Sequence, residues 1–438
     1  MSNPYSGLFE RQQQAWTGAA EMVETLGSVP EANEEVANVE VGQTPSESVY
    51  EENKLELHHY ESRTEEQHDV PLLIVYALVN RPYILDLQPD RSVVRTFLDN
   101  GFDVYMIDWD EPSLLDHSLG FQDYVDRYLD NCVDVVRDRS GRDDINVLGY
   151  CMGGTMSTMY ASLYPEKVRN LGLMAAALCF NEDGGIFGRW VGDDTIDVEL
   201  LAETFGTVPS ELIDAGFGMG EPVANNLTKY LRFFDNLEDE DFVRNFARME
   251  RWLDESIDVA GEAFVDFVTD TYREQKLYNN EQYIAGKHAD IENLEMPIAQ
   301  VVATYDHIVP PVASTAFNDV VPSDDVTVFE QKSGHIGLSV SSRALEELWP
   351  NVCDWFAERS QVDGDDVDGD ESAEADSEQS DLETVDGIGP TYAERLRAAG
   401  IESVAALADA DPATVATDAE VPVARLEDWV VQARERRN

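Results

Sequence analysis

The feature that most constrains this chain is the motif GYCMGG at residues 149–154, which stands directly after an apolar run and directly before a helix-like stretch. Gly149 and Gly153 flank Cys151 at a distance of two residues on each side. This spacing is typical of a nucleophile elbow, a strand-to-helix turn so sharp that larger side chains would collide there. The motif favours Cys151 as a nucleophile over a buried cysteine beside glycines that serve only helix packing.

Strand-like and helix-like segments alternate around this motif. The apolar runs of buried-strand length lie at residues 72–79, 103–108, 145–149, 171–177, 298–304 and 326–330. The helix-like stretches lie at residues 92–100, 121–138, 153–164 and 342–356. The alternation predicts a mostly parallel sheet with helices on both faces. Together with the elbow, it predicts an α/β-hydrolase fold.

This alternation of strands and helices stops between about residues 179 and 295, where the chain is aromatic-rich and mostly helix-like. We expect this segment to be a helical cap inserted into a domain that spans residues 66–360. Residues 1–65 are polar and rich in glutamate, which predicts a peripheral N-terminal arm.

Two segments are expected after the sheet-forming domain. Residues 361–381 contain no lysine, arginine or aromatic residue, so they predict a disordered acidic linker. Residues 382–438 regain helical periodicity, and Gly387, Gly389 and Pro390 suit a helix-hairpin-helix module. Eleven acidic side chains against six arginines in this module favour protein contact or an inert appendage over DNA binding.

An elbow requires an acid and a base. In this fold the acid follows the nucleophile along the chain, and a histidine, the base, follows the acid. Asp306 comes just after the predicted strand 298–304, and His335 comes a few residues after the last predicted strand. His307 is the competing base, but it is next to the acid in sequence and poorly placed to face it. We therefore predict Cys151, Asp306 and His335 as the catalytic residues.

The elbow also predicts where an oxyanion would be held. Cys151 would lie at a helix N-terminus, where the helix dipole and free amides favour a thiolate and the Met152 amide can bind an oxyanion. The second donor is expected from a backbone amide near Val79 or Asn80, in the loop after the first strand.

Cysteine spacing argues against a metal cluster or a disulfide scaffold. The remaining cysteines, Cys132, Cys179 and Cys353, are predicted to be small core residues. Neither a metal nor a cofactor is expected.

The composition excludes several kinds of partner. The chain has 438 residues, with 88 acidic side chains against 30 basic ones and a formal net charge of −58. Such a field repels nucleic acid and anionic membrane surfaces, and it is typical of proteins from salt-loving organisms. No window approaches the run of about 20 apolar residues that crosses a bilayer, so we expect a cytoplasmic protein.

Four segments together resemble polyhydroxyalkanoate synthases, specifically the short catalytic subunit of the two-subunit kind. They are residues 71–109, GYCMGG at 149–154, YDHIVPP at 305–311 and SGHIG at 333–337. The likeness runs from about residue 66 to 358. The acidic surface, the linker and the hairpin module are not part of the usual family core, and they suggest a halophilic archaeal version.

The resemblance implies the α/β-hydrolase fold. It also implies polymerisation of a short-chain 3-hydroxyacyl-coenzyme A, such as 3-hydroxybutyryl-coenzyme A, into polyester through an acyl group on Cys151. It also implies a second synthase subunit, a homo- or hetero-oligomer and a location on polyester granules. The division of work between Asp306 and His335 stays open. The rival interpretations are a dienelactone-hydrolase-like enzyme with a cysteine nucleophile and a noncatalytic granule scaffold.

Overall fold

The computed structural model describes residues 39–361, apart from gaps at 181–183, 193–195, 219–235 and 237–238, and most residues between 382 and 436. The chain divides into two compact units. One contains residues 1–133 and 143–360, and the other contains residues 134–142 and 361–438. The first part of the N-terminal arm and nearly all of the expected linker lie outside the described residues.

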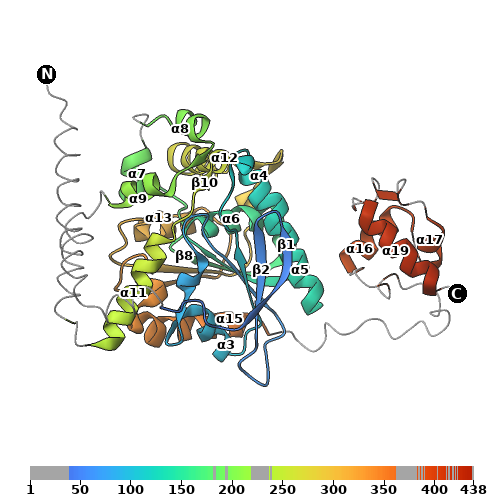
Figure 1. The fold of residues 1–438 in the computed structure, drawn as a ribbon, viewed down its shortest axis with the longest axis horizontal. Helices are drawn as coiled ribbons and strands as arrows, with labels where there is room; N and C mark the ends of the chain where they lie inside the picture. The colour runs from blue at the N-terminus through green and yellow to red at the C-terminus, as the bar shows by residue number, and fades with distance from the viewer. Residues whose placement is uncertain are drawn as a thin grey trace. The chain divides into compact units, whose positions relative to one another are not determined.

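An eight-stranded sheet forms the centre of the larger unit (Figure 1), in the order β1-β2-β6-β3-β7-β8-β13-β14. Its strands are β1 Ser46–Glu52, β2 Leu55–Tyr60, β3 Leu72–Val75, β6 Val104–Asp108, β7 Ile145–Tyr150, β8 Val168–Met174, β13 Ile298–Ala303 and β14 Val326–Gln331. β1, β2 and β6 pair antiparallel, and all other neighbours pair parallel. The predicted mostly parallel sheet is confirmed.

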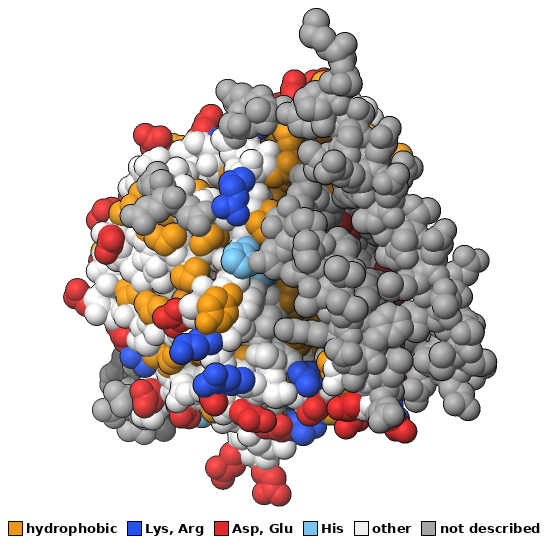
Figure 2. Space-filling view, turned by 90° about the vertical axis from the view of Figure 1, so that its left-hand side faces the viewer, with side chains coloured by type: hydrophobic (Ala, Val, Ile, Leu, Met, Phe, Trp, Pro, Cys, Tyr) orange, Lys and Arg blue, Asp and Glu red, His pale blue; other side chains and the backbone are white. Residues whose placement is uncertain are grey.

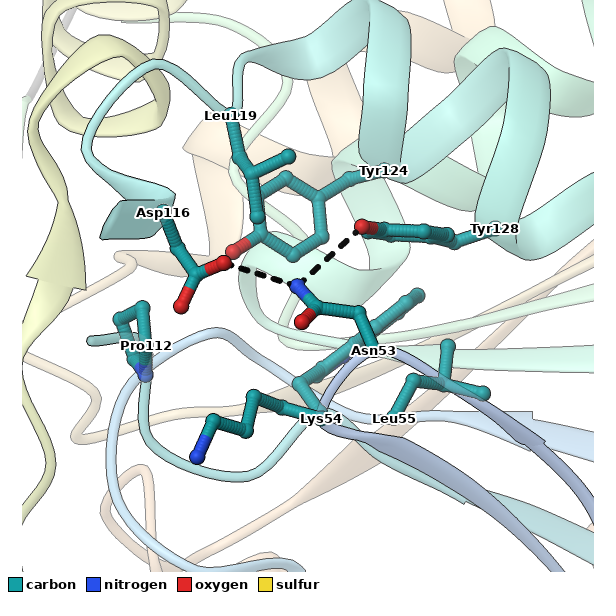
Figure 3. A pocket seen from close by; sticks show the side chains of 9 residues that line it. Asn53, Lys54, Leu55, Pro112, Asp116, Leu119, Tyr124 and Tyr128 are labelled. Carbon is teal, nitrogen blue, oxygen red and sulfur yellow. Dashed lines mark hydrogen bonds between the residues drawn. The ribbon is translucent and has the colours of Figure 1, made fainter. Parts of the chain in front are cut away.

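The prediction of a peripheral N-terminal arm up to residue 65 is wrong at its end. β1 and β2 form a hairpin at one edge of the sheet. The hairpin turns at Asn53, whose φ is +54°. The side-chain amide of Asn53 donates to Asp116 Oδ1 at 2.9 Å and to the Tyr128 hydroxyl at 3.4 Å. Figure 3 shows these bonds in the small pocket under the turn. The prediction missed the hairpin because glutamates fill its exposed positions, which hides the alternation of the buried Leu55 and Leu57.

Helices cover both faces of the sheet, as Figure 1 shows. The segments around the sheet are α3 Val93–Asp99, α4 Phe121–Asp123, the π-helical η3 Tyr124–Leu129, α5 Asp130–Ser140, α6 Met152–Leu163, α13 Pro311–Thr315, α14 Gly337–Val340, the π-helical η9 Ala344–Leu348 and α15 Trp349–Arg359. Ser92 begins α3 by accepting the Arg95 amide with its side chain. The ring of Phe97 on α3 lies edge-on to Phe356 on α15, with centroids 5.9 Å apart. These two helices thus share one apolar layer against the sheet.

The helical cap leaves the sheet after β8 and returns at β13, as the sequence predicts. Its described helices are α7 Gly185–Val191, α8 Val198–Phe205, α9 Ser210–Gly218, α11 Glu240–Asp254, α12 Gly261–Asp266 and the π-helical η6 Phe267–Arg273. Short strand pairs lie at β4 Asp86–Gln88 with β5 Arg91–Ser92, at β9 Thr207–Val208 with β10 Val259–Ala260, and at β11 Tyr283–Ile284 with β12 Lys287–His288.

The smaller unit contains the helices α16 Pro390–Ala398, α17 Val404–Asp409 and α19 Val423–Arg436. Leu396, Leu407, Leu426 and Trp429 are buried in its core. Pro390 occupies the first position of α16, where its missing N–H costs nothing. Gly387 and Gly389 lie outside the described residues. In the described part of the chain, no helix is long and apolar enough to cross a membrane.

Candidate active site

The turn between β7 and α6 holds Cys151 in a backbone conformation that residues other than glycine rarely adopt, with φ +55° and ψ −120°. A Cβ atom at Gly149 would lie 2.5 Å from the Cα of Gly154, and one at Gly153 would lie 2.1 Å from the Val75 carbonyl oxygen. Both distances are too short for any side chain, so the two glycines permit the close packing of the turn. The Cys151 amide donates to the Met174 carbonyl of β8 at 2.9 Å, which anchors the strained residue to the sheet.

Asp306 and His335 meet beyond the carboxyl ends of β13 and β14. The His335 Nδ1–H donates to Asp306 Oδ2 at 2.6 Å. The amides of Ile308 and Val309 each donate to Asp306 Oδ1 at 2.9 Å. The carboxylate is buried, and these three donors fix its orientation.

The environment of His335 favours its charged form. Burial lowers the pKa of the imidazole, but the charge of Asp306 and the neighbouring Cys151 outweigh burial and raise the pKa to about 10. A hydrogen bond between His335 and Cys151 acts in the same direction. The structure therefore brings the three residues Cys151, His335 and Asp306 together in one chain of contacts.

His307 is placed differently from His335. Its side chain is exposed, whereas His335 is only 8 % exposed. The carbonyl of His307 accepts the Ile186 amide of α7 at 2.7 Å, so this residue joins the cap to the loop after β13.

The loop after β3 passes directly over the elbow. β3 ends at Val75 instead of continuing to residue 79, and the backbone of Val75 and Tyr76 lies against Gly153. The next part of the loop is tied to the cap, because Asn80 accepts the Ser256 hydroxyl and the Arg81 carbonyl accepts the Trp252 indole N–H at 2.8 Å. Asn80 has a φ of +62°. The roles of Met152, Val79 and Asn80 as oxyanion donors stay predictions.

Two tyrosines that the sequence reasoning missed also lie at this site. Tyr150 packs its ring against the His335 imidazole, with centroids 5.2 Å apart. Tyr272 of the cap is buried, and burial, together with the nearby Cys151 and Asp306, raises the pKa of its hydroxyl well above the ordinary range. Its ring stacks on Phe180 at 3.9 Å. Tyr150 stands within the elbow motif and could have been singled out, whereas no sequence pattern marks Tyr272.

The other cysteines are core residues, as predicted. Cys132, Cys179 and Cys353 are buried, and burial raises the thiol pKa of Cys132 and Cys353. Cys151 is the more accessible thiol. Among the described residues, no cluster of histidine, cysteine and carboxylate side chains has the geometry of a metal site.

Comparison with known families agrees with this architecture. Residues 70–341 match the profile of the alpha/beta hydrolase fold. Residues 20–97 match that of the poly-beta-hydroxybutyrate polymerase (PhaC) N-terminus, and residues 380–435 match the SAM-like helix-hairpin-helix tandem.

Curated relatives cover nearly the whole chain. A poly(3-hydroxyalkanoate) polymerase subunit PhaC from Haloferax mediterranei is 51% identical and aligns over 99% of both chains. The protein of the same name from Haloarcula marismortui is 50% identical over 98% of both. That from Allochromatium vinosum is 40% identical, over 73% of this chain and 90% of its own. On the strength of its fold and of these alignments, the chain belongs to the poly(3-hydroxyalkanoate) polymerase subunit PhaC family.

Proposed function

We propose that this chain polymerises 3-hydroxyacyl-coenzyme A into polyester, with Cys151 carrying the growing acyl group. The observation that carries the proposal is the contact chain at the elbow, in which His335 lies beside Cys151 and donates to Asp306 at 2.6 Å. Names of relatives that align over nearly the whole chain support the substrate class.

The first half of the cycle is a thioester exchange. The Cys151 thiolate attacks the acyl carbonyl carbon of the substrate, and the bond from that carbon to the sulfur of coenzyme A breaks. The imidazolium of His335 donates its proton to the departing thiolate. Because one thioester replaces another, the acyl group on Cys151 remains activated for transfer.

The second half of the cycle forms the ester. The 3-hydroxyl oxygen of another unit attacks the acyl carbonyl on Cys151, His335 accepts the hydroxyl proton, and the sulfur leaves as a thiolate. Asp306 stabilises the imidazolium that results and holds its ring in place. Charge on the carbonyl oxygen would be held by the Met152 amide and by an amide of the loop after β3, near Val79 or Asn80.

An aromatic cluster of the cap, of which Tyr272 lies near Cys151, supports an apolar acyl chain as the substrate. Phe180, Phe187, Phe267 and Tyr272 of the cap form consecutive ring contacts, with centroids 3.9 to 6.3 Å apart. We expect short acyl chains, such as the 3-hydroxybutyryl group, to be accepted. A second polymerase subunit and attachment to polyester granules in the cytoplasm complete the proposal.

The test is incubation with 3-hydroxybutyryl-coenzyme A, with free thiol and insoluble polyester measured together. We expect stoichiometric release of coenzyme A with polymer, and neither product from Cys151→Ala. Cys132→Ala is the matched control, since Cys132 is a buried thiol outside the site. Release of coenzyme A with free 3-hydroxybutyrate and no polymer would identify a hydrolase instead. Polymer formation by Cys151→Ala would overturn the assignment of the nucleophile.

A further inference from the structure

The imidazole of His335 is bound at its edges by the two other residues of the site. Its Nδ1–H donates to Asp306 Oδ2 at 2.6 Å, and a hydrogen bond joins it to Cys151. Ring N–H groups donate in the plane of the ring. Neither contact therefore restrains the faces of the imidazole, and a tilt out of its plane must be opposed by something else.

The ring of Tyr150, the last residue of β7, supplies the contact at a face. Its centroid lies 5.2 Å from that of the His335 imidazole, and the two planes meet at 31°. This geometry is an offset stack, an arrangement in which aromatic rings attract one another. A positive charge within about 6 Å of an aromatic face is also attracted to it. The contact therefore favours the imidazolium in its present orientation.

Tyr150 is itself held firmly in place. It pairs with Met174 of β8, and its ring lies against that of Tyr76, with centroids 5.6 Å apart. The Tyr76 carbonyl accepts the Trp109 indole N–H at 2.8 Å, and both tyrosines are only 2 % exposed. The face contact thus comes from a rigid part of the sheet, whereas His335 stands in a loop.

The ring of Tyr150, and not its hydroxyl, is the part that acts on the histidine. Burial, with Tyr76 and Cys151 nearby, raises the pKa of this hydroxyl well above its ordinary range, so it stays protonated. Ser339 of α14 lies near it, but among the described residues the hydroxyl has no hydrogen-bond partner of good geometry. Phenylalanine at this position would keep the face contact and lose little else.

Few charged groups act on the imidazole. Asp306 and Cys151 are the titratable residues whose charges raise its pKa, and α14, which follows His335, carries no titratable side chain. Acidic side chains line the rim of the face drawn in Figure 2. At about 1 M salt the Debye length is about 3 Å, so such surface charges are screened. The local contacts of His335 therefore decide its charge and orientation.

One of these contacts changes during the proposed cycle. In the acyl enzyme the sulfur of Cys151 belongs to a thioester, so it carries no charge and attracts the imidazolium less. In this state His335 has to accept the proton of the 3-hydroxyl group. We infer that Tyr150 is a positioning residue that holds the His335 imidazole by its face while Cys151 carries the acyl group. The inference rests on the proposed function for its substrate, but not for its geometry.

The kinetic test compares Tyr150→Leu, which removes the ring, with Tyr150→Phe, which keeps it. With 3-hydroxybutyryl-coenzyme A, release of the first equivalent of coenzyme A per chain measures acylation, and continued release measures elongation. Tyr150→Leu should lower the elongation rate by about tenfold or more and the acylation rate by less than about threefold. Tyr150→Phe should leave both rates within about twofold of wild type.

The second test follows the histidine without substrate. Iodoacetamide converts Cys151 into a thioether, which, like the acyl enzyme, cannot ionise. Nuclear magnetic resonance of isotope-labelled histidine then gives the pKa of His335, whose signal is assigned by its loss in His335→Gln. The pKa in alkylated Tyr150→Leu should be lower than in alkylated Tyr150→Phe by roughly 0.5 to 1.5 pH units. If circular dichroism shows that Tyr150→Leu does not fold, the longer, unbranched Tyr150→Met replaces it in both tests.

Three results would overturn the inference. Equal losses of acylation and elongation in Tyr150→Leu would mean that Tyr150 only shapes the elbow. A Tyr150→Phe variant as slow as Tyr150→Leu would assign the effect to the hydroxyl. The same His335 pKa in both alkylated variants would show that the face contact does not act on the charge. Release of coenzyme A without polymer by the wild type would instead contradict the proposed function, and the titration would still decide the role of Tyr150.

Discussion

At the scale of the residue, the site depends on a histidine that lies between an acid and a thiol. Asp306 holds Nδ1 of His335, and Cys151 lies beside the same imidazole. The positions of all three could be predicted because each follows a strand in the order that the fold requires. The position of Tyr272 could not be predicted, because only the packing of the cap brings it to the elbow.

Replacing His335 and His307 one at a time distinguishes the proposed base from a histidine in a loop. We expect His335→Ala to lower the turnover rate by roughly 10² to 10⁴-fold, because it removes the proton donor of the first half-reaction and the proton acceptor of the second. His307→Ala should change it by only about a few-fold, since the His307 side chain is exposed whereas the Asp306 carboxylate is buried. The check is the rate of coenzyme A release by both purified variants, and exchanged phenotypes would contradict the assignment of the base.

The ion pair predicts a pH-dependent loss of stability. Asp306→Asn should lower the free energy of unfolding by roughly 1–3 kcal/mol near pH 6. Because folding raises the pKa of His335 from 6.5 to about 10, the pair stabilises fully below pH 6.5, and its contribution is lost as the pH rises through about 10. The difference between wild type and variant, measured by denaturant unfolding, should therefore shrink toward about pH 10.5. A difference that is constant with pH would contradict this account.

At the scale of the element, four parallel strands, β6, β7, β13 and β14, were predicted to within one residue at each end, since apolar runs bounded by turns leave few alternatives. β8 was predicted at residues 171–177 but runs from Val168 to Met174. The β1–β2 hairpin was missed because its outer face is glutamate-rich, and a local pattern cannot distinguish an acidic strand from a polar arm. Likewise, β3 ends at Val75 although the apolar run continues, because the chain must turn over the elbow there. Tertiary contacts, not propensity, set both boundaries.

One contact between the cap and the domain is expected to respond to pH. Asp266 of α12 accepts the amide of Phe121, the first residue of α4, at 2.8 Å. Burial, with nearby Asp270 and Glu262, raises the pKa of Asp266 to about 6. Protonation therefore stabilises the native state as the pH falls below about 6, and ionisation above it is unfavourable.

Asp266→Asn keeps an acceptor for the Phe121 amide but removes the charge. We expect it to raise the free energy of unfolding by roughly 1–3 kcal/mol at about pH 8 and to leave it nearly unchanged near pH 4. Thermal unfolding at the two pH values measures the effect. A variant that is less stable than the wild type at both would show that the charge strengthens the contact.

At the scale of the whole molecule, the net charge of −58 makes salt a condition of stability. At about 0.05 M salt the charges repel one another across the fold, whereas the Debye length falls to about 3 Å at 1 M. We expect both the melting temperature and the polymerisation rate to rise from low salt to about 2 M. Equal values at both concentrations would argue against salt adaptation.

The C-terminal module is predicted to be dispensable for the chemistry. The sheet and the loops that carry Cys151, Asp306 and His335 are complete before Ser360. The hydroxyl of Ser360 accepts the Asn146 side-chain amide at 2.9 Å inside the larger unit. A chain cut after Gln361 keeps this bond and should retain polymerase activity within about twofold. The assay compares coenzyme A release by the full and shortened chains in molar salt. A large loss would assign the module a part in catalysis or assembly.

The cap has a consequence for how the protein is made. β8 and β13 are neighbours in the sheet, yet residues 175–297 lie between them in the chain. A ribosome adding about 5–20 residues per second needs roughly 6 to 25 s to synthesise this stretch. Throughout that interval the nascent chain presents the edge of β8, an apolar strand, to its surroundings. That edge must therefore be protected until β13 is synthesised, by a chaperone or by the emerging cap.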